Sequence, residues 1–198
     1  MKHVRLTDIT AGTKEQQNAV LNIRNHPNVR SNMYTDHVIS LDEHHTWIDS
    51  LKTSPHHIVF MVLVDGVVSG VASINALDRQ HKKSDWAFYL DESARGGLGA
   101  VLEITMLDFA FNDLALEKLN CEVIETNLNV VQMHEKFGFQ REGFFRSNIE
   151  KNGARIGVYR LGITRAEWHQ KKASIVEKYA SRLDNFSITL NYEDDKNG

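Results

Sequence analysis

The sequence predicts an α+β fold in which helices flank one mixed, mostly antiparallel central sheet. Two β-rich runs, 57–64 and 67–76, are joined by Asp65-Gly66, which is among the strongest short signals for a β-hairpin. Residues 99–114 have apolar side chains at helical spacing and begin directly after a glycine cluster. The order strand, helix, meander, helix, strand, helix, strand is typical of an α+β domain.

The first third of the chain is predicted to hold one short strand and two helices. Residues 3–6 alternate briefly and favour a strand. Residues 13–24 have the spacing of a helix that must stop or bend before Pro27. Ser40 begins a capping-box pattern, because its oxygen can accept backbone N–H groups, so a second helix runs from about 41 to 52.

The remaining elements follow from the same periodicities. The third strand of the meander covers 86–90, and a further helix covers 129–137. Later strands are predicted over 119–125, 143–146 and 157–161.

One compact domain suits a chain of 198 residues with 41% hydrophobic content. We expect it to cover residues 1–163, with a C-terminal extension over 164–198. The extension starts as a charged helical pattern and ends in the polar stretch 193–198, which we expect to be a loose tail.

Composition narrows the classes of partner. A formal net charge of −3 provides no broad basic field for phosphates, so we expect no nucleic-acid partner and favour small molecules or proteins. The longest apolar run, 58–64, is too short to span a bilayer. The single Cys121 forms no internal disulfide, and the first residues lack the apolar stretch of a signal peptide. These features predict a cytoplasmic protein with no membrane partner.

Ten histidines raise the question of a metal site. None of them falls into a ligand pattern such as His-Glu-x-x-His, and a single cysteine is available to assist. We therefore predict no metal site.

The strongest indication of function is the segment DESARGGLGA at 91–100, between a predicted strand and a predicted helix. Glycines let the backbone approach a bulky ligand, and the first N–H groups of the following helix attract phosphate. The meander before it argues against a βαβ nucleotide fold, and the lack of Gly-Lys-Ser/Thr excludes a Walker loop. A glycine-rich turn that merely joins strand to helix is the alternative.

A second segment decides between these interpretations. Asn127 is followed by His134 and then by Gly138-Phe139. With Gly97 and Gly99, these residues resemble the GNAT acetyltransferases over about residues 3–163. The family's cofactor loop reads Gln/Arg-x-x-Gly-x-Gly/Ala, and its later segment has Asn, a small residue, Tyr and Gly-Phe.

The resemblance implies a GNAT-type sheet and acetyl-CoA as cosubstrate. This chain departs from the family pattern at Ala94, where Gln or Arg is usual, and at His134, which takes the usual Tyr position. The cofactor is expected to contact Phe88, Leu90, Arg95, Gly96, Gly97, Leu98, Gly99, Ala100, Asn127 and Lys136.

Two catalytic residues are predicted for direct attack of an amine on the thioester. Glu122 is the candidate base, because it lies five residues before Asn127, where some GNAT enzymes carry a catalytic Glu. Glu125 is the rival, since a strand places 122 and 125 on opposite faces. His134 is the candidate proton donor to sulfur, the alternative being a residue that only packs against the cofactor.

The first third carries Ile23-Arg24-Asn25, Asn32-Met33-Tyr34, and Glu43-His44 with Trp47. In these residues it resembles the UDP-amino-sugar N-acetyltransferases of pseudaminic acid biosynthesis. That likeness implies transfer to the 4-amino group of a UDP-linked 4-amino-4,6-dideoxy sugar. The sugar nucleotide is expected to contact Arg24, Met33, Tyr34, His44, Trp47 and Trp86. A protein or ribosomal Nα-acetyltransferase and a non-catalytic acetyl-CoA-binding protein are the alternatives. The extension over 164–198 could serve a homodimer.

Overall fold

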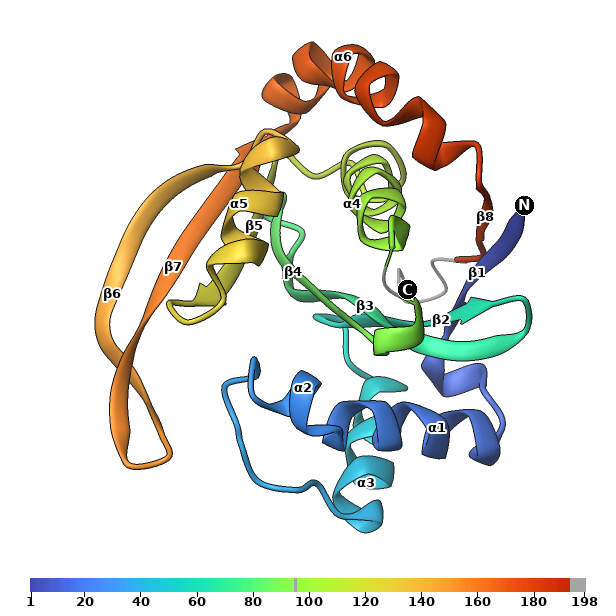
Figure 1. The fold of residues 1–198 in the computed structure, drawn as a ribbon, viewed down its shortest axis with the longest axis vertical. Helices are drawn as coiled ribbons and strands as arrows, with labels where there is room; N and C mark the ends of the chain where they lie inside the picture. The colour runs from blue at the N-terminus through green and yellow to red at the C-terminus, as the bar shows by residue number, and fades with distance from the viewer. Residues whose placement is uncertain (95, 193–198) are drawn as a thin grey trace.

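Helices cover both faces of a central sheet in the computed structural model, which describes residues 1–94 and 96–192 (Figure 1). The described residues form an eight-stranded sheet in the order β6-β7-β5-β4-β3-β2-β1-β8. The pairs β4–β5 and β1–β8 are parallel, and the others are antiparallel. Helices α1 to α3 lie on one face and α4 to α6 on the other (Figure 1). The predicted α+β fold is confirmed.

The strands are β1 (Lys2–Asp8), β2 (Ile58–Val64), β3 (Val67–Asp78), β4 (Lys83–Leu90), β5 (Lys118–Ile124), β6 (Gln140–Lys151), β7 (Ala154–Thr164) and β8 (Phe186–Leu190). The helices are α1 (Lys14–Asn25), α2 (Pro27–Arg30), α3 (Leu41–Leu51), α4 (Leu98–Asp108), α5 (Leu128–Lys136) and α6 (Arg165–Leu183). A π-helical turn, Phe109–Asp113, continues α4.

The helix boundaries of the first third follow the predicted capping signals. The Ser40 side chain accepts from the N–H of Glu43, whose carboxylate accepts from Ser40, so the capping box of α3 is complete. Helix α1 ends at Asn25, and His26 is extended before Pro27 starts the short α2. Proline disfavours the helical conformation of the residue before it, which explains the break.

The sequence predicts the β2–β3 hairpin more accurately than the β6–β7 hairpin. At the β2–β3 turn, Asp65 has φ 50° and Gly66 has φ 85°, as a type I′ turn requires. The β6–β7 hairpin is much longer than predicted from 143–146 and 157–161. Nearly all of β6 is exposed, so it lacks the apolar alternation that marks a half-buried strand.

The sheet opens between β4 and β5. Their parallel pairing covers only three positions and ends at Asp85 opposite Asn120. Beyond that point, β4 continues to Leu90 beside β3 and β5 continues to Ile124 beside β7. We call the opening between these two strand halves the splay. Its β4 edge has backbone groups with no strand partner in the described chain.

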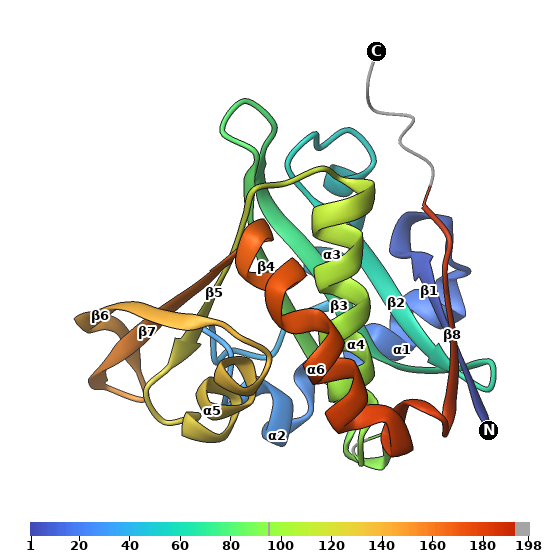
Figure 2. The same cartoon turned by 90° about the horizontal axis from the view of Figure 1, so that it is seen from above.

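The C-terminal part after residue 163 belongs to the same core as the part before it. Trp168, Ile175 and Tyr179 of α6 are buried in the cluster that contains α4 and the sheet. Strand β8, which the sequence did not predict, pairs in parallel with β1 (Figure 2). The predicted tail at 193–198 lies outside the described residues.

We expect Trp168→Ala to lower the free energy of unfolding by about 3–5 kcal/mol, the usual cost of removing a buried tryptophan. Trp168 is 0% exposed, and its Nε1 donates to Asp108 at 2.9 Å. Trp47→Ala is the control, because Trp47 is 38% exposed and should cost much less. Urea unfolding measures both; equal losses would mean that α6 contributes little to the core.

Candidate active site

The glycine loop has the backbone geometry of an anion cradle. Gly96 and Gly97 have φ 114° and 113°, which side chains rarely adopt, and α4 begins directly afterwards at Leu98. The oxygen of Gly97 accepts from the N–H of Ala100 and of Val101. The first amides of a helix have no partner within it, and they attract anions. Arg95 lies outside the described residues.

The predicted cofactor residues differ in burial and in the element that carries them. Leu90, Leu98 and Ala100 are buried, so only their backbone can meet a ligand. A Cβ added at Gly99 would lie 3.9 Å from the Phe88 ring. The loop therefore adjoins β4. Asn127 is the half-buried N-cap of α5, and Lys136 is exposed at its C-terminal end.

His134 is buried among side chains on the α4 face of the sheet, and we call these surroundings the histidine pocket. It is 3% exposed, and its Nδ1 is 2.8 Å from Oε1 of Glu103 on α4. Its ring meets Trp86 of β4 edge-on at 5.6 Å and lies 5.2 Å from the ring of Phe139. The thiol of Cys121 also interacts with the ring. His134 is therefore enclosed by groups from four segments.

Two polar atoms in this pocket have no hydrogen-bond partner among the described residues. They are Nε1 of Trp86 and Oε2 of Glu103, and both are buried. A buried donor or acceptor is costly when it is unpaired, so a donor from β4 and an acceptor from α4 suit a ligand that carries both. The amide groups of a pantetheine arm have that chemistry, and the glycine cradle suits its pyrophosphate. The residues present therefore fit acetyl-CoA.

Glu122 lies on the opposite face of the sheet from His134. On β5 it alternates with Cys121, whose side chain faces the His134 pocket. Oε1 of Glu122 accepts from Nη1 of Arg160 at 3.0 Å, and Arg160 also donates two bonds to Asp85 at 2.9 and 2.8 Å. Arg160 thus links β7 to both strands at the start of the splay.

Tyr34 completes this group from the 31–40 loop. Its hydroxyl donates to Oε2 of Glu122. Burial and the Glu122 carboxylate raise the pKa of Tyr34, so the hydroxyl stays protonated. We call Tyr34, Asp85, Glu122 and Arg160 the carboxylate network. Two carboxylates and one guanidinium give it a net negative charge.

Glu125, the rival base, is engaged elsewhere. Its Oε1 accepts from the N–H of Gly157 at 2.6 Å, and its own N–H donates to the Gly157 oxygen at 3.0 Å. These bonds close the end of β5 onto β7. Glu122, in contrast, presents its carboxylate to Tyr34 and Arg160 at the splay.

A cationic group lies beside the same loop. Arg24 donates to Oγ1 of Thr35 at 2.9 Å, and its Nη1 is buried without a partner among the described residues. Lys151 at the end of β6 donates to the oxygens of Arg30, at 3.1 Å, and of Met33. These bonds tie the 31–40 loop to the β6–β7 hairpin.

His44, Trp47 and Trp86 are placed differently from the predicted acceptor pocket. Nε2 of His44 is 2.8 Å from the Gln17 oxygen, so this buried ring joins α3 to α1. Trp47 stacks near His44 on α3, which packs on β2 rather than on β5. Trp86 is 1% exposed on the α4 side of the sheet, whereas Tyr34 lies on the other. Helical and strand periodicity alone could not distinguish the buried positions of His44 and Trp86 from a pocket.

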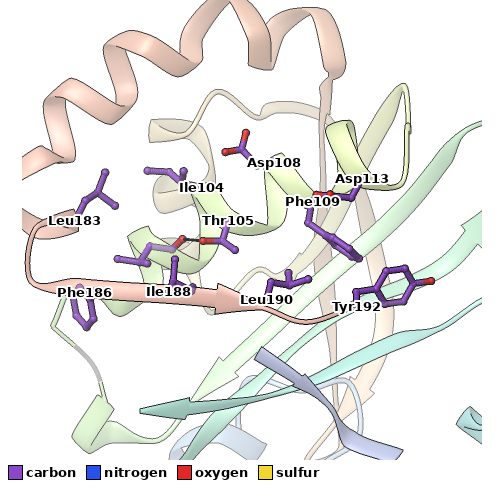
Figure 3. Close-up of a pocket in the computed structure, with 11 residues that line it drawn as sticks. Ile104, Thr105, Asp108, Phe109, Asp113, Leu183, Phe186, Ile188, Leu190 and Tyr192 are labelled. Atoms are coloured by element: carbon purple, nitrogen blue, oxygen red, sulfur yellow. Dashed lines mark hydrogen bonds between the residues drawn. The ribbon is translucent and has the colours of Figure 1, made fainter. Parts of the chain in front are cut away.

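Two cavities lie away from both groups. One of about 470 Å³ lies between α4 and β8, where Figure 3 shows mostly apolar side chains with Asp108 and Asp113 at the rim. Another, of about 520 Å³, lies beside β1 and β8. Neither contains a residue of the splay.

Glu103, Asp85 and Arg160 were not predicted as site residues. Glu103 interrupts the apolar run of α4, and an acidic residue in a fully apolar helix signals a buried partner. Asp85 and Arg160 are 75 residues apart, so no local pattern joins them.

In the described chain, no group of three or more His, Cys, Asp or Glu residues is placed to hold a metal ion. The described helices include none long and apolar enough to cross a membrane.

Known proteins resemble this chain over most of its length. A family model described as an acetyltransferase (GNAT) domain matches residues 9–158. The prophage-derived N-acetyltransferase YokL of Bacillus subtilis is 34% identical over 101 residues, 50% of this chain and 57% of that protein. The acetyltransferase PseH of Campylobacter jejuni is 22% identical over 136 residues, 69% of this chain and 84% of that protein. The chain thus matches little more than half the length of YokL.

A solved structure shares the fold. The spermidine N-acetyltransferase of Vibrio cholerae, determined with CoA and spermine, superposes with a TM-score of 0.77 at 20% sequence identity. The match covers 84% of this chain and 98% of that one. At this identity, the likeness establishes the fold.

Gly97→Val should abolish the rise in melting temperature that acetyl-CoA produces, because a side chain at φ 113° distorts the cradle. Gly66→Val is the matched control, since Gly66 has φ 85° in a turn far along the sheet. Both changes should cost about 1–2 kcal/mol in backbone strain. Only Gly97→Val should lose the ligand-induced shift. A normal shift in Gly97→Val would place the cofactor elsewhere.

Proposed function

The chain belongs to the GNAT acetyltransferase family, and from that premise we propose that it transfers acetyl from acetyl-CoA to a small-molecule amine. The observation that carries this proposal is the pair of opposed groups at the splay. The glycine cradle and the buried His134 lie on one side of the sheet, and the carboxylate of Glu122 lies on the other. Acyl transfer to an amine needs both a proton acceptor and a proton donor.

Glu122 accepts the proton from the attacking amine in this proposal. An amine must be neutral when it attacks, so a base beside it increases the rate. Tyr34 and Arg160 hold both oxygens of Glu122 and fix its orientation. A positioned carboxylate can also attract the protonated amine before it loses its proton.

His134 holds the proton for the leaving thiolate. Acetyl-CoA supplies the acetyl group as a thioester when it is bound. The rings of Trp86 and Phe88 on β4 pack edge-on against the His134 ring. The amides of 98–100 and Asn127 would hold the cofactor along the α4 face.

The acceptor that we favour is a UDP-linked 4-amino-4,6-dideoxy sugar. Its support is the cationic group of Arg24, Arg30 and Lys151. Burial lowers the pKa of Lys151; Asp36 opposes this effect, and the two arginines add to it. Cations that destabilise one another favour an anionic ligand such as a diphosphate. The likeness to PseH agrees with this choice.

A polyamine is the second candidate. The carboxylate network has one more carboxylate than guanidinium groups, which favours a ligand with several positive charges. The Vibrio cholerae protein that shares the fold binds spermine. The two candidate acceptors have opposite net charge. The diphosphate of the sugar nucleotide would bind the cationic group, whereas the polyamine would bind the carboxylate network.

Glu122→Gln should reduce turnover by about 10²- to 10⁴-fold, the range for a positioned base, with little change in cofactor affinity. Glu125→Gln is the matched control on the same strand and should lose much less. Steady-state kinetics and acetyl-CoA binding measure the two effects. A larger loss in Glu125→Gln would make that residue the base.

Acetyl-CoA with a radioactive acetyl group, offered with UDP-amino sugars, polyamines and peptides, tests the acceptor. We expect transfer to the UDP-amino sugar, inhibition by UDP, and a higher KM in Arg24→Ala. If UDP at millimolar concentration does not inhibit, the sugar proposal is wrong and the polyamine or peptide acceptor takes its place. Cofactor binding with no transfer to any amine would instead indicate a non-catalytic acetyl-CoA-binding protein.

A further inference from the structure

Glu103 is a buried carboxylate to which the proposed transfer assigns no role. It lies on α4, the helix that begins at the glycine cradle, and it is 0% exposed. Its neighbours along α4 are apolar and buried. A carboxylate in such surroundings is strongly destabilising unless a charged or donating partner compensates for its lost hydration.

The partner of Glu103 is His134, 31 residues later on α5. The 2.8 Å contact joins Oε1 to Nδ1. A carboxylate can only accept, so Nδ1 carries a hydrogen and the ring is held in one orientation. The pair therefore connects the cradle helix to the helix that carries the candidate donor.

Two titratable groups face the His134 ring among the described residues. They are Glu103 from α4 and Cys121 from β5. The other groups are aromatic side chains: Trp86 and Phe88 from β4, and Phe139 from the residue before β6. Burial alone would lower the pKa of His134. Glu103, followed by Cys121, overcomes this effect and raises the pKa to about 10.

We propose that Glu103 is a positioning residue: its carboxylate fixes the His134 ring and keeps Nε2 protonated as the donor to the leaving sulfur. This inference rests on the proposed acetyl transfer. The acceptor nitrogen bonds to the acetyl carbon as the carbon–sulfur bond breaks. Nε2 gives its proton to sulfur, Glu122 takes one from nitrogen, and exchange with water restores both. Burial raises the pKa of Glu103 itself, and the His134 ring beside it opposes that effect.

Nitrogen NMR of the histidine rings tests this pair in the cofactor-free full chain. We expect both nitrogens of His134 to be protonated at pH 8. In Glu103→Gln, burial acts without the carboxylate and is opposed by Cys121 alone, so the pKa should fall and the ring should lose its charge at a lower pH than in the wild type. A neutral His134 ring at pH 8 in the wild type would overturn the proposal. This measurement stands even if Glu103→Gln does not fold.

Kinetics provide the second test. Glu103→Gln should lower kcat by about tenfold to a hundredfold, and its activity should fall at a lower pH than that of the wild type as the pH rises. Glu103→Asp, which keeps the carboxylate, should regain part of the loss. Glu135→Gln is the control, because Glu135 is the exposed neighbour of His134 and pairs with Arg141.

The outcomes separate the two proposals. A Glu103→Gln variant with the kcat and pH profile of the wild type overturns the role of Glu103 and leaves the proposed function intact. A wild type that acetylates no amine overturns the proposed function. In that case a charged His134 ring would be structural.

Discussion

The early end of the β4–β5 pairing is the constraint on which the rest of the site depends. If the two strands paired along their full length, backbone hydrogen bonds would close the sheet between the histidine pocket and the carboxylate network. The pairing instead stops at Asp85 and Asn120. Arg160 bridges Asp85 and Glu122 at that point, so the strands are joined at the start of the splay and separate beyond it.

The alternation of side chains along β5 places Cys121 and Glu122 on opposite faces of the sheet. Cys121 faces the histidine pocket, and the next residue, Glu122, faces the 31–40 loop. His134 and Glu122, the proposed proton donor and proton acceptor, thus lie on opposite faces of the sheet. A thioester placed in the splay would lie between them, and the backbone separation prevents the two groups from neutralising each other.

The carboxylate network and the Glu103–His134 pair differ in solvent exposure, and therefore in their contribution to stability. The carboxylate network is partly exposed, with Arg160 24% and Glu122 30% exposed, so each pair contributes about 0–1 kcal/mol to stability. Glu103 and His134 are enclosed, and removal of one partner from such a pair costs about 3–5 kcal/mol. The former group can adapt to a ligand, while the latter is fixed by the fold.

The sequence alone determined what local chemistry specifies: the capping box of α3, the Asp65-Gly66 turn, the glycine loop, and the helix that carries His134. Each depends on residues a few positions apart. It did not reveal strand β8, the full β6–β7 hairpin, or the burial of His44 and Trp86, because exposure depends on packing between distant segments. Only the tertiary structure joined Glu103 to His134 across 31 residues and Arg160 to Asp85 across 75, since a buried or bridged charge is defined by its partner in space.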